Sequence, residues 1–204
     1  MTAGTQPAAV TLPRQLVSKV GRLVRIEFLE AALEPRLTAM YLAFQPRNSF
    51  QGLPPIKDEV CINWVRDMIR TGVNLLALSP PGDVVGHTAL FPVDQRKCEM
   101  LVVVAPAFQD QGIGTGLVQT CIAVAAERGF QRIWLPVSAT NMRARRVYTK
   151  CGFRYVSPKL ARELDMVLDL PRPEPPAAPL APAAPQALLL APSFLDAPLR
   201  AVPM

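Results

Sequence analysis

The feature that most constrains the fold is an apolar run followed by a glycine-rich turn and a helix-forming stretch. Residues 100–104 are all apolar, and residues 112–128 form the helix-like segment, which Gly129 ends. The turn that opens this segment consists of Gln109, Asp110, Gln111, Gly112, Ile113, Gly114 and Thr115. Glycine lets a backbone approach a ligand closely, and the first amides of a helix are unpaired and carry partial positive charge. The sequence therefore predicts a phosphate-binding turn over residues 109–115.

The rest of the chain alternates strands with helices. Residues 73–78 and 84–91 flank a Pro-Pro-Gly turn and are predicted to form a hairpin. Further strands are predicted over 23–29, 100–104 and 132–137, a closing antiparallel pair over 154–156 and 164–168, and helices over 34–44, 57–70, 112–128 and 142–151. This order is typical of an α/β fold with a mixed sheet.

The two ends of the chain differ in composition from its centre. Residues 1–21 mix small, polar and proline positions, so we expect a flexible lead-in. Residues 171–204 hold ten of the 22 prolines and no glycine. Proline removes hydrogen-bond donors and fixes φ, so a disordered Pro/Ala-rich tail is predicted there. One folded domain is expected over residues 22–170.

Composition argues against several classes of protein. The net charge of +6 favours anionic ligands, but no basic stripe is interleaved with aromatics, so nucleic acid is an unlikely partner. The sharpest basic cluster is Arg143, Arg145 and Arg146, which is typical of a solvated helix face. No apolar run reaches the ~18 residues that span a bilayer, and no secretory signal is visible.

We therefore expect a cytoplasmic protein with no membrane partner. Its four cysteines lack CxxC spacing and its single histidine has no cluster around it. Reduced thiols are expected, and no metal site is predicted.

Two segments together resemble signatures of the GNAT superfamily of acyl-CoA N-acyltransferases. The turn Gln109-Asp110-Gln111-Gly112-Ile113-Gly114 is similar to the family's Arg/Gln-x-x-Gly-x-Gly/Ala acyl-CoA signature. Downstream, residues 141–153 resemble the family's Asn-x-x-Ala-x-x-x-Tyr-x-x-x-Gly-Phe segment. A dinucleotide fingerprint and a P-loop fit worse, because position 117 is leucine and no Gly-Lys-Ser/Thr is present. The resemblance implies a central mixed, mostly antiparallel twisted sheet flanked by helices.

The resemblance also implies acetyl-CoA as acyl donor, with its diphosphate on the amides of residues 109–115. In this family the preceding strand parts from its neighbour, which would expose the backbone of Val102, Val103 and Val104 to the pantetheine arm. The side chains of these valines would remain part of the hydrophobic core. Asn141 has two interpretations that stay open, a helix N-cap and a contact to the cofactor arm.

Two further residues are candidates for proton transfer. Tyr148 is either an aromatic of the core or the general acid that protonates the departing thiolate, which a phenol can do because its pKa exceeds that of a thiol. It would also lie beside the cofactor. Glu99 is either a surface glutamate at a strand end or the base that takes a proton from the amine. His87 is expected to be structural, and Cys121 and Cys151 are not expected to act as nucleophiles.

The sequence therefore predicts an N-acetyltransferase that transfers an acetyl or other acyl group to a primary amine of a small molecule or protein. Direct attack in a ternary complex is the expected mechanism, with the acceptor over the loop 45–56 and its flanking helices. The alternative is a non-catalytic acyl-CoA-binding regulatory module. The acceptor, the acyl chain length and a homodimer are left open by the sequence.

Overall fold

The computed structural model describes residues 10–49, 53–156 and 162–171. The chain divides into one unit of residues 1–173 and another of residues 174–204. Residues 172–204 of the predicted tail and residues 1–9 of the predicted lead-in lie outside the described residues.

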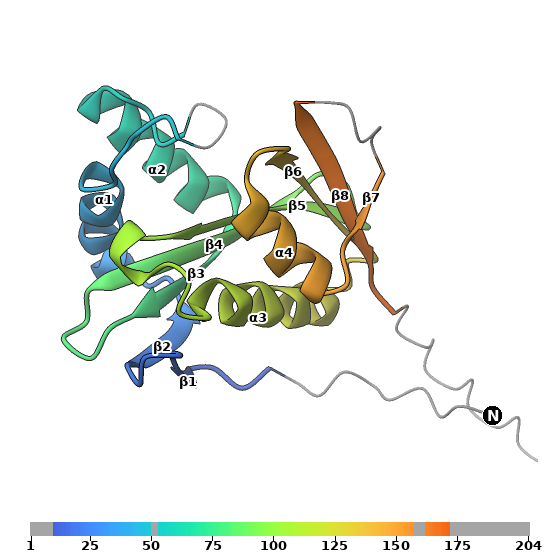
Figure 1. Ribbon diagram of the computed structural model, residues 1–204, viewed down its shortest axis with the longest axis horizontal. Helices are drawn as coiled ribbons and strands as arrows, with labels where there is room; N and C mark the ends of the chain where they lie inside the picture. Colours follow the sequence, from blue (N-terminus) through green and yellow to red (C-terminus); the bar gives the residue numbers. More distant parts are fainter. Residues whose placement is uncertain (1–9, 50–52, 157–161, 172–204) are drawn as a thin grey trace, which may run out of the picture. The chain divides into compact units, whose positions relative to one another are not determined.

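The described residues form one sheet of eight strands in the order β1-β2-β3-β4-β5-β6-β8-β7 (Figure 1). The strands are β1 (Arg14–Val17), β2 (Leu23–Phe28), β3 (Val73–Leu78), β4 (Val84–Pro92), β5 (Lys97–Val104), β6 (Arg132–Ser138), β7 (Arg154–Tyr155) and β8 (Glu163–Asp169). Only β5 and β6 pair in parallel, and all other neighbours in this sheet are antiparallel. The predicted mixed, mostly antiparallel sheet is confirmed, and so is the hairpin of β3 and β4.

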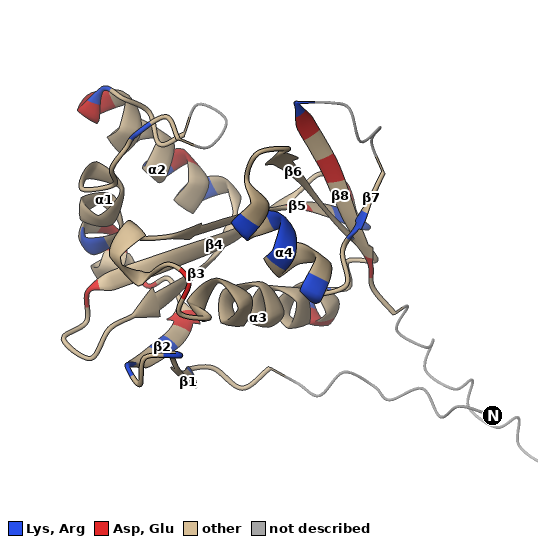
Figure 2. Cartoon of the chain, viewed as in Figure 1, with Lys and Arg blue, Asp and Glu red and all other residues tan. Residues whose placement is uncertain are grey.

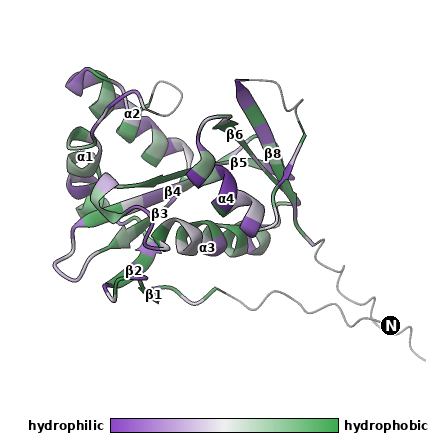
Figure 3. Cartoon of the chain, in the orientation of Figure 1, coloured by the Kyte–Doolittle hydropathy of each residue, from purple (hydrophilic) through white to green (hydrophobic). Residues whose placement is uncertain are grey.

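Helices cover both faces of this sheet. The helices α1 (Glu34–Leu42) and α2 (Asp58–Thr71) pack with Leu76 and Val103 on one face. The helices α3 (Ile113–Glu127) and α4 (Met142–Lys150) pack with Leu75 and Met100 on the other. Because successive side chains of a strand point to opposite faces, central strands covered on both faces must be apolar at nearly every position, as Figure 3 shows for β3. Short 3₁₀ turns, Ala31–Leu33 and Pro106–Phe108, precede α1 and follow β5.

The sheet begins earlier than the sequence predicts. Residues 14–17, assigned to the flexible lead-in, form β1 and pair antiparallel with β2. The prediction is wrong there because Leu16 is the one residue of this four-residue edge strand that is not exposed, so no alternating apolar pattern is visible. Leu16 packs directly on α3, where a Cβ added to Gly116 would lie 2.8 Å from its Cδ2.

Candidate active site

The parallel strands β5 and β6 are paired over only part of their length. The ladder joins Lys97–Glu99 to Arg132–Trp134 and then ends, although β5 continues to Val104 and β6 to Ser138. The two strands therefore part immediately after Glu99 and Trp134. No ladder pair joins the later residues of the two strands, where the C=O of Val104 accepts from the Gln109 side chain and that of Ser138 from the N–H of Asn141.

The register of β4 and β5 identifies which backbone groups of β5 face β6. The N–H of Ala105 donates to the C=O of Val85 at 3.0 Å, and that of Val93 to the C=O of Lys97 at 2.9 Å. Since both backbone groups of a strand residue point to the same side and alternate along the strand, Val103 faces β4, whereas Val102 and Val104 face β6. The expected backbone contact to the cofactor fits Val102 and Val104 but not Val103, whose backbone lies opposite His87.

The sequence of β6 places a proline just beyond the end of the ladder. The N–H of Leu170 donates to the C=O of Gln131 at 2.8 Å, and that of Ala139 to the C=O of Arg162 at 2.9 Å. Odd-numbered residues of β6 therefore face β8, and Pro136 faces β5. Proline has no N–H to donate and is normally excluded from a central strand. Here it stands where the ladder has already ended, two residues after the last pair.

The glycine-rich turn lies at the end of β5. Gly112 has φ 88 and caps α3 from the left-handed region, which favours glycine. The first helical bond beyond it runs from the N–H of Gly116 to the C=O of Gly112 at 3.1 Å. Within the described residues the amides of Ile113, Gly114 and Thr115 donate to no backbone acceptor. Unpaired amides at a helix N-terminus suit a phosphate, so this turn fits the diphosphate of acyl-CoA.

Side chains tie the turn to its surroundings. The Nε2 of Gln109 donates to the C=O of Val104 at 3.0 Å, and its Oε1 accepts from Nη1 of Arg143 at 3.0 Å. Nη2 of Arg143 also lies 3.2 Å from Oδ2 of Asp110. The Nε2 of Gln111 donates to the C=O of Ala107, whereas its buried Oε1 has no partner among the described residues.

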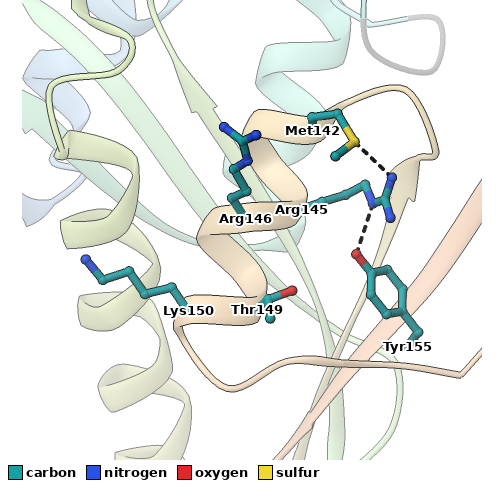
Figure 4. A pocket seen from close by; sticks show the side chains of 6 residues that line it. All are labelled: Met142, Arg145, Arg146, Thr149, Lys150 and Tyr155. Carbon is teal, nitrogen blue, oxygen red and sulfur yellow. Dashed lines mark hydrogen bonds between the residues drawn. The ribbon is translucent and has the colours of Figure 1, made fainter.

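Arg143 was not predicted to belong to the site, and the only signal in the sequence was its place in the basic cluster of α4 (Figure 2). The other two arginines of that cluster, Arg145 and Arg146, and the nearby Lys150 have different surroundings. Arg145 donates to the hydroxyl of Tyr155 at 2.9 Å and to the C=O of Ala139 at 2.7 Å, beside a shallow pocket on the outer side of α4 (Figure 4). Arg146 and Lys150 point away from this pair in the same view. The interpretation as a solvated helix face is therefore wrong for Arg145, which is half-buried and bonded, whereas Arg143 and Arg146 are exposed.

Tyr148 occupies the buried face of α4. It is 7% exposed, and its ring centre lies 5.7 Å from that of Phe153. It packs with Met100 and Cys98 in the cluster beneath α3 and α4. Burial, with a smaller effect of Cys121, raises the pKa of its hydroxyl above the ordinary value. The core interpretation is confirmed, and the role as an acid stays a prediction.

Glu99 lies inside β5, since the strand begins at Lys97 rather than at Met100. It stands opposite Phe91 of β4 and in register with Trp134 of β6, in the last pair before the strands part. Alternation along β5 places it on the face of α1 and α2, opposite the cluster that holds Tyr148. Burial raises the pKa of its carboxyl, while Lys97 opposes the shift.

The remaining polar candidates have structural partners. The Oδ1 of Asn141 accepts from the N–H of Ala144 at 3.1 Å, so the N-cap interpretation is confirmed and the contact to the cofactor arm stays a prediction. His87 is fully buried on β4 and is bonded to the hydroxyl of Tyr41 at 2.7 Å and to Oδ1 of Asn74 at 3.0 Å. Its expected structural role is therefore confirmed.

Burial raises the pKa of all four cysteine thiols. All four are free thiols, and burial raises the pKa of Cys98 and of Cys121 to about 12. A thiol with such a pKa is almost wholly protonated at neutral pH. No group of three potential metal ligands occurs in the part of the chain that the structure describes. Among the same residues, no helix has the length and apolar character needed to cross a membrane.

A mixed sheet whose parallel central strands part beside a glycine-rich helix start defines the GNAT class of acyl-CoA-binding folds. The family model described as Acetyltransferase (GNAT) family matches residues 29–153. This chain belongs to that family.

Similar proteins support the assignment to this family. An uncharacterized N-acetyltransferase of Mycobacterium tuberculosis is 33% identical over 81 residues, which are 39% of this chain and 52% of the relative. The chain thus matches about half the length of that relative. The GNAT domain of S. lividans PAT has a TM-score of 0.67 at 18% identity, covering 77% of this chain and 96% of that chain.

A putative acetyltransferase from Salmonella typhimurium, solved with its cofactor acetyl-CoA, has a TM-score of 0.59 at 21% identity. The similarity covers 76% of this chain and 98% of that chain. Likenesses at such low identity show the fold.

Proposed function

We propose that this chain transfers an acetyl group from acetyl-CoA to a primary amine by direct attack in a ternary complex. The observation that supports this most is the parting of β5 and β6 directly beside the unpaired amides of α3. Acetyl-CoA supplies an activated thioester when it is bound. The amides of Ile113, Gly114 and Thr115 would hold its diphosphate. The open backbone groups of Val102 and the open N–H of Val104 would hold its pantetheine arm, since the C=O of Val104 already accepts from Gln109.

The two proton-transfer candidates suit this arrangement. Glu99 and Tyr148 approach the parted strands from opposite faces of the sheet. An amine that attacks a carbonyl must lose a proton on its own side, while the leaving sulfur gains one on the other. Glu99, with its raised pKa, would accept the proton of the amine, directly or through a water. Tyr148 would donate to the sulfur.

The backbone N–H of Val104 lies on the open side of β5, where it would polarise the thioester carbonyl. The acceptor would enter on the face of α1 and α2, near Glu99 and the loop 45–56, of which residues 50–52 lie outside the described residues. The side chains that line this face do not single out one amine. A small amine, an amino acid, a peptide N-terminus and a protein lysine are therefore all to be tested.

The experiment combines calorimetric titration of acetyl-CoA with a thiol-release assay over these amines. Saturable binding with turnover of one amine supports the proposal. Binding of acetyl-CoA without turnover of any amine favours the alternative, a non-catalytic acyl-CoA-binding regulatory module. Absence of binding at millimolar acetyl-CoA would contradict both.

A further inference from the structure

The turn between β1 and β2 lies directly against the predicted diphosphate turn. The N–H of Lys19 donates to the C=O of Gln111 at 2.9 Å. The guanidinium of Arg22 lies 5.3 Å from the centre of the Phe108 ring, just before the same turn. Residues 18–22 precede the segment 29–153 that the family model matches. A part of the chain that no family signature covers therefore borders the site.

This β1–β2 turn has a defined shape. The N–H of Ser18 donates to the C=O of Arg22 at 2.8 Å, and Oγ of Ser18 accepts from the N–H of Arg22 at 3.0 Å. Gly21 closes the turn with φ 78 and donates to the C=O of Ser18 at 2.9 Å. Ser18 is only 4% exposed. The backbone of Lys19 is thus held by its own turn and by Gln111 together.

The side chain of Lys19 runs along the diphosphate turn. A Cβ placed on Gly112 would lie 3.7 Å from Cγ of Lys19 and 4.0 Å from its Cε. Gly112 immediately precedes the unpaired amides of α3, so the end of this lysine lies at the same helix start.

The charges around the turn leave Lys19 available as a cation, while the guanidinium of Arg22 lies over the Phe108 ring. Asp110 places a carboxylate in a turn that is expected to bind an anion, and Arg143 pairs with it at 3.2 Å. Arg143 also donates to Gln109, so its charge is already engaged. Lys19 forms no ion pair with any residue in the described ranges.

We propose that Lys19 is a cofactor-binding residue, supplied by the β1–β2 turn, whose ammonium contacts the diphosphate of acyl-CoA. The inference rests on the proposed function, since it assumes that acyl-CoA binds at α3. An ammonium on a flexible stem acts as a point charge that follows a phosphate without a fixed geometry. The N-terminal hairpin would then be a wall of the site as well as an edge of the sheet.

The test compares Lys19→Met with Lys19→Arg and with a matched control, Lys57→Met, at the exposed start of α2. Methionine keeps the apolar stem against Gly112 and removes the charge. Three ligands are titrated by calorimetry, each at low and high salt: acetyl-CoA, acetyl-dephospho-CoA and S-acetylpantetheine, which lacks the diphosphate.

For Lys19→Met we expect about three- to tenfold weaker binding of both diphosphate ligands at low salt, the size of one partly solvated ionic contact. The loss should shrink at high salt, where such contacts are screened. Binding of S-acetylpantetheine should not change, and Lys19→Arg should restore affinity. Lys57→Met should bind all three ligands as the wild type does.

Three results would overturn the inference while leaving the proposed function intact. The first is unchanged binding of acetyl-CoA by Lys19→Met. The second is an equal loss of affinity for S-acetylpantetheine, which would indicate a structural role. The third is a loss of affinity confined to acetyl-CoA, which would place the ammonium on the 3′-phosphate. Failure of the wild type to bind acetyl-CoA would instead refute the proposed function, and the inference with it.

Discussion

Replacement of Tyr148 by phenylalanine tests the chemistry of the site most directly. The ring packs against Phe153 with 5.7 Å between centres, and Tyr148 is 7% exposed, so phenylalanine keeps the contacts and removes only the hydroxyl. We expect the free energy of unfolding to change by about 1 kcal/mol or less, the usual net value of one hydroxyl contact. Binding of acetyl-CoA should be nearly unchanged.

The size of the rate effect follows from the environment of the hydroxyl. A positioned general acid contributes about 10²- to 10⁴-fold. Burial raises the pKa of Tyr148 further above that of a thiol, which makes proton donation to sulfur less favourable. We therefore expect a fall of about 10²-fold in kcat, at the lower end of that range.

The assay is thiol release at saturating acetyl-CoA and amine, with cofactor affinity measured separately by calorimetry. Tyr155→Phe is the matched control, because the hydroxyl of Tyr155 accepts from Arg145 on the outer side of α4, and its kcat should stay near that of the wild type. A kcat for Tyr148→Phe within about twofold of the wild type, well short of the general-acid range, would refute the reasoning and leave Tyr148 as a core residue only.

Three further predictions concern other parts of the domain. Glu99→Gln should lower the rate and move the acid limb of the pH–rate profile to higher pH, because only free amine in solution would then react; an identical profile would exclude Glu99 as the base. Burial lowers the pKa of His87 to about 3 in the folded protein. His87 of the unfolded chain takes up this proton near pH 6.5. The free energy of unfolding should therefore be highest above pH 6.5 and fall by about 1.4 kcal/mol per pH unit as the pH falls from there toward 3. Urea unfolding of His87→Gln should show a shallower pH dependence, and equal slopes would contradict the assignment. Gly116→Ala should cost no more than about 1 kcal/mol, because the terminal methyl of Leu16 can shift and alanine favours the helix, as a melting curve would show, and Leu16→Ala in the same chain should relieve the contact. Additive losses in the double variant would argue against the close approach.

Local sequence patterns were enough to predict most of the elements and the position of the turn. Hydrophobic alternation, the glycine at the start of α3 and the spacing from Asn141 to Phe153 are all short-range signals, and they identified the class of fold. The same signals failed for β1, because a short edge strand with only one residue that is not exposed carries almost no pattern.

What the sequence determined by itself was where the chain turns, which faces are apolar and which residues could exchange protons. The tertiary structure alone decided that β5 and β6 part after Glu99, that Val103 faces β4 and that Arg143 and Lys19 border the glycine-rich turn. These facts depend on strand register and on contacts between segments far apart in the chain. No local pattern encodes such contacts, because they arise only when the whole sheet and its helices pack together.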